Sequence, residues 1–142
     1  MTTSEVKTIL INALKSKKKY ILTKDTRAEY EQTLFGRGIS YESDGSTRQK
    51  GVNKTQEAYD LLAEYEENEK RAETEWILAT SLANKYIASL RDDKQREVLT
   101  RHYINGKDWA IVAEEMHYSE SRIYQLHGYA LKNITLNYSN DM

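Results

Sequence analysis

A repeat of apolar residues at alternating spacings of four and three runs through residues 55–90 and constrains the fold more than any other feature. Because an α-helix has about 3.6 residues per turn, this spacing keeps the side chains on one face of a helix. The repeat comprises Ala58, Leu62, Tyr65, Glu69, Ala72, Trp76, Ala79, Ala83, Tyr86 and Leu90. Only Glu69 interrupts the apolar series. A helix with one narrow apolar stripe is not stable alone in water, so this helix needs a partner.

The preceding segment is the nearest candidate for that partner. Thr3 or Ser4 can cap a helix that begins with an apolar face. That face comprises Val6, Ile9, Leu10, Ala13 and Leu14. The helix is expected to continue, since apolar residues then recur every seven positions, at Leu14, Ile21, Ala28 and Phe35. Lys17, Lys24 and Glu31 fill the intermediate positions, so the pattern predicts an imperfect coiled-coil seam.

Charge is segregated between these two segments. Residues 1–54 hold 11 Lys/Arg and 6 Asp/Glu, a net +5, whereas residues 55–90 hold 3 and 8, a net −5. Opposite charges favour antiparallel packing, either within one chain or between two copies, and the sequence leaves both open. The lysine cluster at residues 15–19 is either a phosphate-binding patch or a solvated face whose stems cover apolar groups.

Residues 36–53 separate the two predicted helices. They are rich in turn-forming residues and lack periodicity, so they predict a flexible loop. Its cations are Arg37, Arg48 and Lys50, and Lys54 follows it directly. The segment is therefore either a long connection or a second contact with nucleic acid or polymerase. The expected domains are a helical hairpin over residues 1–90 and a helix-turn-helix module over residues 91–138.

The composition predicts an all-α fold, with the hairpin followed by the module. There is no proline, only 6 glycines, and 30% of the residues are charged, which favours long solvated helices. Cysteine is absent and no apolar run is long enough for a membrane span, so we expect a soluble, cytoplasmic protein. His102, His117 and His127 lack metal-type spacing, and Ser119 beside Glu120 lacks triad geometry. We therefore expect neither enzyme activity nor a metal or cofactor.

Residues 109–134 have the pattern of a helix-turn-helix. Asp108 is placed to cap a first helix, a tight turn follows at residues 116–118, and Ser119 is placed to cap a second helix. The expected apolar stripe of the first helix is Ile111, Val112 and Met116. The expected buried side of the second helix is Ile123, Leu126, Ala130, Leu131 and Ile134. A neighbouring outward stripe, able to meet a major groove, is Ser121, Gln125, Gly128 and Lys132.

A shorter helix is expected to brace this motif. Asp92 or Asp93 can cap it, and Gln95 follows Asp92 at capping-box spacing. Its inward face is expected to comprise Val98, Leu99, His102 and Tyr103. Gly106 ends it. After Ile134 helical periodicity is lost, so the tail is expected to fray.

Residues 90–134 resemble region 4 of the bacterial sigma-70 family. The resemblance rests on residues in the family's order and spacing: Arg96-Glu97-Val98-Leu99, Arg101, Tyr103, Gly106, Val112-Ala113-Glu114-Glu115-Met116, Ser119, Arg122-Ile123, Gln125-Leu126 and Ala130-Leu131. Within this family the chain is most similar to small Gram-positive phage and prophage proteins of the ArpU and RinA type, which join such a module to an N-terminal helical segment. His117 stands where the family's turn usually has glycine, so a strained turn is expected there.

The resemblance implies that the start of the second helix reads bases in the major groove, through Glu120, Ser121, Arg122, Tyr124 and Gln125. A glutamine can pair with adenine, and a glutamate can accept from the amino group of cytosine. Candidate contacts to the DNA backbone are Lys132, Arg101 and Lys107. Each of these is alternatively a surface charge, and Arg122 alternatively pairs with Glu115 or Glu120.

The leading hypothesis is a phage-type transcription regulator that binds double-stranded DNA. Residues 91–142 hold 7 Lys/Arg and 8 Asp/Glu, so a single module releases few counterions. We therefore expect either a homodimer reading two half-sites or help from bacterial RNA polymerase. A second hypothesis is an interaction protein that imitates region 4 to dock on the polymerase, with little DNA contact. A third is a small terminase-like subunit for DNA packaging.

Overall fold

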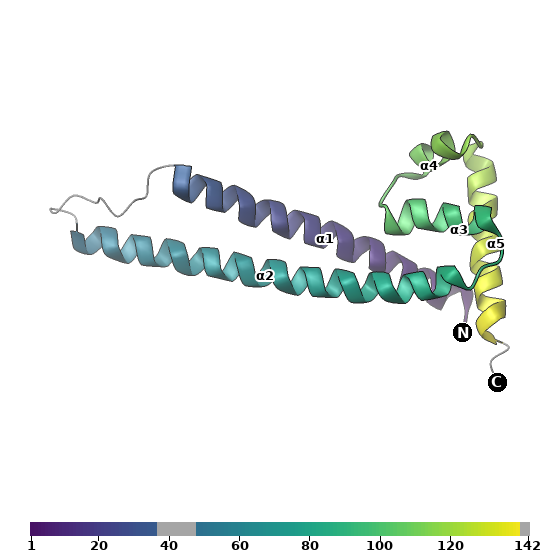
Figure 1. Ribbon diagram of the computed structural model, residues 1–142, viewed down its shortest axis with the longest axis horizontal. Coiled ribbons are helices and arrows are strands. Elements are labelled where there is room, and N and C mark those ends of the chain that lie inside the picture. Colours follow the sequence, from purple (N-terminus) through teal and green to yellow (C-terminus); the bar gives the residue numbers. More distant parts are fainter. Residues whose placement is uncertain (37–47, 140–142) are drawn as a thin grey trace. The chain divides into compact units, whose positions relative to one another are not determined.

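The computed structural model describes residues 1–36 and 48–139, without the side chains of residues 48–53. Every regular element in these ranges is helical, and no strand occurs in them. In chain order (Figure 1) they are α1 (Thr3–Gly36), α2 (Arg48–Ala88), α3 (Asp93–Leu99), a single π-helical turn η2 (Thr100–Ile104), α4 (Trp109–Met116) and α5 (Glu120–Ser139). The predicted all-α class is confirmed, with long N-terminal helices followed by a short helical module.

The chain forms two compact units. The module unit holds residues 1–18 and 75–142, and the hairpin unit holds residues 19–74. This division does not coincide with the boundary expected at residue 90, because the first turns of α1 and the last turns of α2 share a core with the C-terminal helices. Within the described ranges, no helix is both long and apolar enough to cross a bilayer.

Polar and aromatic contacts join α1 to α2 in the hairpin unit. The Nε atom of Arg27 donates to Oε2 of Glu69 at 2.7 Å. The Tyr30 ring meets the Tyr65 ring edge-on, with centroids 5.2 Å apart. The Tyr30 hydroxyl donates to the carbonyl oxygen of Ala58 at 3.1 Å. The predicted pairing therefore forms within one chain, and the one polar position of the α2 repeat holds an ion-pair partner for α1.

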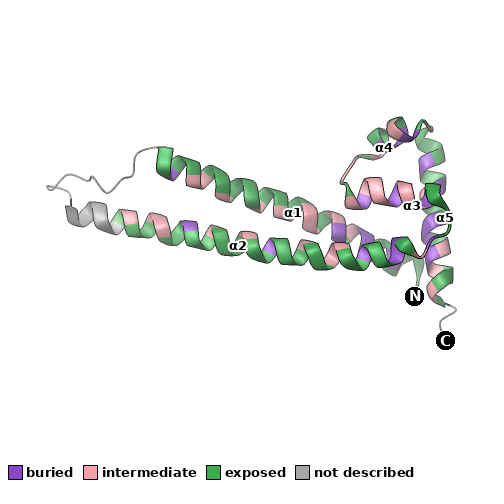
Figure 2. Cartoon of the chain, in the orientation of Figure 1, coloured by how far each residue is buried: buried purple, intermediate pink, exposed green. Residues whose placement is uncertain are grey.

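Burial separates the two predicted repeats. All positions of the α2 repeat are buried or half-buried, which confirms it (Figure 2). The seven-residue repeat on α1 is wrong beyond Leu14, because three of its positions are exposed: Ile21, Ala28 and Phe35. The inward face instead runs through Arg27, Tyr30 and the buried Leu34. Two of these three residues are polar, so a search for apolar periodicity does not detect the face.

The connection expected over residues 36–53 is shorter in the structure. Gly36 is the last residue of α1, and α2 begins at Arg48 rather than at Thr55. Residues 48–53 are therefore helical. The prediction of a flexible loop at residues 37–47, including Arg37, lies outside the described residues.

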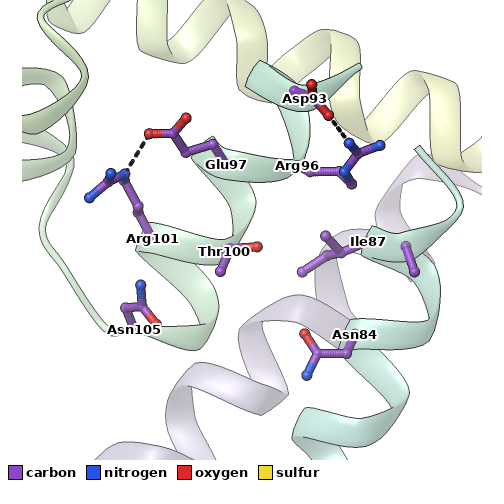
Figure 3. A pocket seen from close by; sticks show the side chains of 9 residues that line it. Asn84, Ile87, Asp93, Arg96, Glu97, Thr100, Arg101 and Asn105 are labelled. Carbon is purple, nitrogen blue, oxygen red and sulfur yellow. Dashed lines mark hydrogen bonds and ion pairs between the residues drawn. The ribbon is translucent and has the colours of Figure 1, made fainter. Parts of the chain in front are cut away.

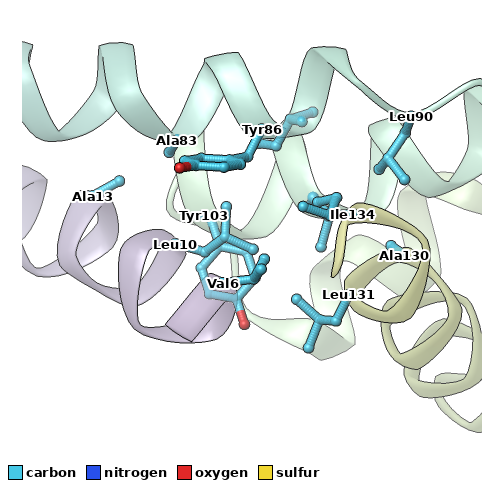
Figure 4. Close-up of a cluster of buried hydrophobic side chains, with 12 residues drawn as sticks. Val6, Leu10, Ala13, Ala83, Tyr86, Leu90, Tyr103, Ala130, Leu131 and Ile134 are labelled. Carbon is cyan, nitrogen blue, oxygen red and sulfur yellow. The ribbon is translucent and has the colours of Figure 1, made fainter. Parts of the chain in front are cut away.

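The larger core of the module unit joins α1, α2, α3, η2 and α5 (Figure 4). It contains Val6, Leu10, Ala13, Ala83, Tyr86, Ile87, Leu90, Leu99, Tyr103, Ala130, Leu131 and Ile134. Val6 and Leu10 are completely buried. Lys17 adds a polar contact, since its Nζ atom donates to the carbonyl oxygen of Ile104 at 3.0 Å. At least this member of the lysine cluster fastens α1 to the turn before the helix-turn-helix.

A smaller core holds the helix-turn-helix together. It contains Val98, Val112, Ala113, Met116, Ile123 and Leu126. The inward position predicted for Ile111 is wrong: this side chain is 42% exposed. The short helix α4 has room for only one buried face, and Val112, Ala113 and Met116 occupy it.

The end of α5 also differs from the prediction. The helix continues to Ser139 instead of fraying after Ile134. The Tyr138 ring packs against Tyr86 at a centroid distance of 4.6 Å. The Nδ2 atom of Asn137 donates to the carbonyl oxygen of Ser89 at 2.9 Å. Contacts with α2 and the residue that follows it therefore stabilise turns whose own sequence is a weak helix former.

Candidate nucleic-acid interface

His117 makes the turn between α4 and α5. Its φ is 59° and its ψ is 39°, in the left-handed region. The backbone N–H of Tyr118 donates to the carbonyl oxygen of Ala113 at 3.0 Å, and that of His117 to Glu114 at 3.3 Å. These bonds satisfy carbonyl groups at the end of α4 and fix the direction in which the chain leaves it. The strained turn expected from the missing glycine is confirmed.

The helix starts match the predicted caps in part. Oγ of Ser119 accepts from the backbone N–H of Arg122 at 3.1 Å, so Ser119 caps α5 as predicted. Asp92 caps α3, accepting from the N–H groups of Lys94 and Gln95. Asp108 stands at the N-cap position of α4, but its side chain accepts no capping hydrogen bond. In α1 the cap is Thr2, whose Oγ1 accepts from Glu5 at 3.2 Å, rather than Thr3 or Ser4.

Helix α5 has one buried and one exposed face. All five predicted inward residues are buried: Ile123, Leu126, Ala130, Leu131 and Ile134. The predicted contact residues on this helix are all exposed: Glu120, Ser121, Arg122, Tyr124, Gln125 and Lys132. Gly128 lies among them, and a Cβ atom there would meet nothing within 4 Å. The exposed face of α5 therefore carries donors, acceptors and aromatic rings. Figure 2 shows buried and exposed residues alternating along this helix.

Two of the exposed residues bind each other. Nη1 of Arg122 donates to Oε1 of Gln125 at 2.6 Å. The alternative pairing of Arg122 with Glu115 or Glu120 does not occur in the described structure, where Glu115 binds other cations. Arg122 and Gln125 thus form one polar unit on the outer face of α5.

Arg101 and Lys107 are held by carboxylates. Nη1 of Arg101 lies 2.6 Å from Oε1 of Glu115, and Nζ of Lys107 lies 2.5 Å from its Oε2. Nε of Arg101 also donates to Oε2 of Glu97 at 2.8 Å. Lys107 and Arg101 hold the pKa of the Glu115 carboxyl below its usual value, and Glu97 and Glu115 raise the pKa of Arg101. Both candidate phosphate contacts outside α5 are therefore already paired.

Comparison with known proteins bears directly on this helical arrangement. Residues 88–135 match the family model described as sigma-70, region 4. This segment is a sigma-70 region 4-like helix-turn-helix. The match supports a DNA-binding, regulatory role and an interaction with RNA polymerase. No curated protein and no solved structure matches the chain.

An aromatic cluster that was not predicted from the sequence lies beside the region 4-like helix-turn-helix. The His102 ring stacks on Trp109 at a centroid distance of 3.7 Å. The Tyr103 hydroxyl lies 2.8 Å from Nε2 of His127, whose ring is 4.9 Å from Trp109. Tyr103 and His127 are 24 positions apart, so no local spacing reveals the pair. A cavity of about 330 Å³ lies here, lined by Lys7, Ile11, Leu14, His102, Tyr103, Trp109, Tyr124 and His127.

Burial shifts the pKa values of this cluster. It lowers the pKa of His127 to about 4, with smaller contributions from Lys7 and His102. It also lowers the pKa of His102 and raises that of Tyr103 to about 12. At neutral pH the hydrogen bond therefore joins a protonated Tyr103 hydroxyl to a neutral His127 ring, and the imidazole tautomer decides which of the two donates.

A larger open pocket of about 630 Å³ lies between α2, α3 and η2 of the module unit (Figure 3). Its lining includes two cations, Arg96 and Arg101, and both are paired, with Asp93 and Glu97. The pocket therefore offers little to an anionic ligand. Within residues 1–36 and 48–139, no group of three His, Asp or Glu side chains lies close enough to hold a metal ion.

Proposed function

We propose that this protein is a sequence-specific transcription regulator of phage or prophage type, related in function to the ArpU and RinA type late regulators. In this proposal α5 lies in the major groove of double-stranded DNA and the protein has a binding role, not a catalytic one. The observation that carries it is the division of α5 into a fully buried apolar side and an outward side of exposed polar residues. A region 4-like helix-turn-helix presents its second helix to DNA in this way.

The outward residues have the chemistry for reading bases. Gln125 can bond to adenine, Glu120 can accept from cytosine, and Ser121 can act as donor or acceptor. Arg122 bridges to Gln125 in the free protein, so the two side chains are already held side by side before DNA arrives. A bridged pair loses less side-chain entropy on binding than two free side chains.

The shortage of cations on α5 favours a homodimer. On α5, Arg122 and Lys132 are the exposed cations. Two phosphate or base contacts from this helix give weak binding, whereas two copies on adjacent half-sites add their contacts. The site of action in this proposal is the bacterial host cytoplasm, where DNA and polymerase are present.

Joint substitution of Arg122 and Gln125 by alanine tests the base-reading role. The double variant should lose sequence-specific binding to fragments of its own genome, because the bridged pair that reads bases is gone, while helical content and melting temperature stay unchanged. Binding is measured at about 50 and 200 mM salt, where a few phosphate contacts produce a visible loss of affinity.

The matched control is Lys70→Ala, which removes an exposed cation from the hairpin unit. It should bind as the wild type does. Selective binding by the Arg122/Gln125 double variant at wild-type strength would contradict the proposed reading face.

A docking role on RNA polymerase is the second candidate, and the ion pairs favour it. Glu115 occupies both Arg101 and Lys107, and Glu120 places an exposed carboxylate at the start of α5. Both features weaken attraction to DNA. Co-purification with core polymerase, together with no selective DNA binding by the protein alone, would support this candidate over the first.

A further inference from the structure

Helix α4, η2 and the segment that connects them meet at Glu115. This residue lies on α4, Arg101 on η2 and Lys107 in the segment between them, while Glu97 on α3 holds Arg101 from the other side. The distances from Glu115 are 2.6 Å to Arg101 and 2.5 Å to Lys107. Each of its carboxylate oxygens therefore binds a different cation. All these side chains are about one-third exposed, so solvent and a polyanion can reach them.

We propose that Glu115 sets the affinity of the module for DNA by withholding Arg101 and Lys107 from phosphate groups. This inference rests on the proposed DNA-binding function and names a regulator of the same interface. A phosphate that approaches either cation meets a carboxylate that is already bonded to it, so the phosphate must either displace that carboxylate or lie beside a like charge. In both cases the contact gains less than contact with a free cation. In the resting protein the two cations add little to counterion release.

The neighbouring residue Glu114 supplies a matched comparison. It lies on the same helix and carries the same charge, but it is exposed and forms no ion pair in the described part of the chain. Removing its charge raises the net charge of the protein by one, as removing that of Glu115 does. Only the change at Glu115 also frees Lys107 from its ion pair and leaves Arg101 with Glu97 alone, so the difference between the two variants isolates the withheld cations.

The test compares Glu115→Gln with Glu114→Gln. Affinity for a bound DNA fragment is measured between about 50 and 200 mM salt. Each released cation that contacts a phosphate should steepen the plot of log affinity against log salt by about 0.9. Relative to Glu114→Gln, the gain in affinity should therefore be larger at 50 than at 200 mM salt, by about 3.5-fold for one cation and about 12-fold for two. Adding Arg101→Ala and Lys107→Ala should remove the gain.

Elution from a heparin column gives a second readout that needs no specific DNA site. Glu115→Gln should elute at higher salt than Glu114→Gln. Later elution without selective DNA binding by any variant would sustain the inference about Glu115 while rejecting the proposed function. Selective DNA binding in which the two variants have equal salt dependence and equal elution would overturn the inference alone. A loss of affinity in Glu115→Gln with unchanged melting temperature would also overturn it, because Glu115 would then position the cations for phosphate.

Discussion

At the scale of single residues, His117 bears the backbone strain of the helix-turn-helix. Among the described residues it alone combines a side chain with a positive φ. The left-handed conformation brings Cβ too close to the following carbonyl oxygen, which costs roughly 1–2 kcal/mol for a residue other than glycine. Histidine tolerates it better than most side chains do. The turn at His117 therefore lowers the stability of the fold by an amount that glycine at this position would not.

Replacing His117 by glycine should stabilise the protein. Relief of the strain exceeds the extra entropy of the unfolded chain, so the free energy of unfolding should rise by roughly 0.5–1 kcal/mol. Urea denaturation followed by circular dichroism measures it. The control is His117→Ala, which should lower stability because alanine enters this conformation less readily. Equal effects of the two substitutions would show that the strain is not the cause.

His127 should make stability depend on pH. Its pKa is lowered to about 4 by burial, below the value of about 6.5 in an unfolded chain. Between about pH 6.5 and pH 4, His127 is protonated in the unfolded state but neutral in the folded state. The contribution of neutral His127 to the free energy of unfolding is therefore complete above about pH 6.5 and is lost as the pH falls towards 4.

The substitution His127→Gln should weaken this dependence, since glutamine can still form a hydrogen bond with the Tyr103 hydroxyl but does not titrate. Urea midpoints at pH 7.0, 5.5 and 4.5 are compared, and the fall should be smaller in the variant. The exposed His117→Gln removes one imidazole elsewhere and serves as control. An identical fall in wild type and His127→Gln would exclude His127 as the source.

At the scale of elements, the two long helices show what a periodic pattern can and cannot predict. The α2 repeat was predictable because its apolar residues mark one face without ambiguity. The face of α1 was not, because Arg27 and Tyr30 lie inward and bind partners that are distant in sequence. The pattern gave no reason to place an arginine on the inner face. Once Glu69 is known to lie opposite, that position is the expected one.

Helix α1 should matter to the stability of the helix-turn-helix, although the two are far apart in sequence. Leu10 is completely buried in the core that includes Ala130, Leu131 and Ile134 of α5. Replacing it by alanine should lower the free energy of unfolding by about 2–5 kcal/mol, the usual cost of truncating a buried leucine. Chemical denaturation of the full chain measures the loss.

Leu22→Ala is the matched control on the same helix, because Leu22 is 68% exposed. It should change the free energy of unfolding by less than about 0.5 kcal/mol. Equal losses in the two variants would mean that burial of α1 in this core contributes nothing specific.

At the scale of the whole molecule, the sequence predicted which residues of α5 are buried better than it predicted which side chains bind one another. The buried side of α5 was correct in all its residues because helical periodicity is a local property. The partners of Arg101, Lys107 and His127 were not predicted, because Arg101 and Glu115 are 14 positions apart and meet only when η2 and α4 are packed. The near-neutral charge of residues 91–142 predicts weak DNA binding by a single module, and the ion pairs of Arg101 and Lys107 with Glu115 add a structural reason for this prediction.

The shared core of the module unit also sets an order of events during synthesis. Thr3 on α1 meets Thr135 on α5, a separation of 132 residues. At the ribosome's pace of roughly 5–20 residues per second, α5 is made about 7–26 seconds after the start of α1. Until then the apolar turns around Val6 and Leu10 lack the part of their covering surface that Ala130, Leu131 and Ile134 provide. The growing chain therefore carries an incompletely covered apolar segment until α5 has been made, and such a segment favours aggregation.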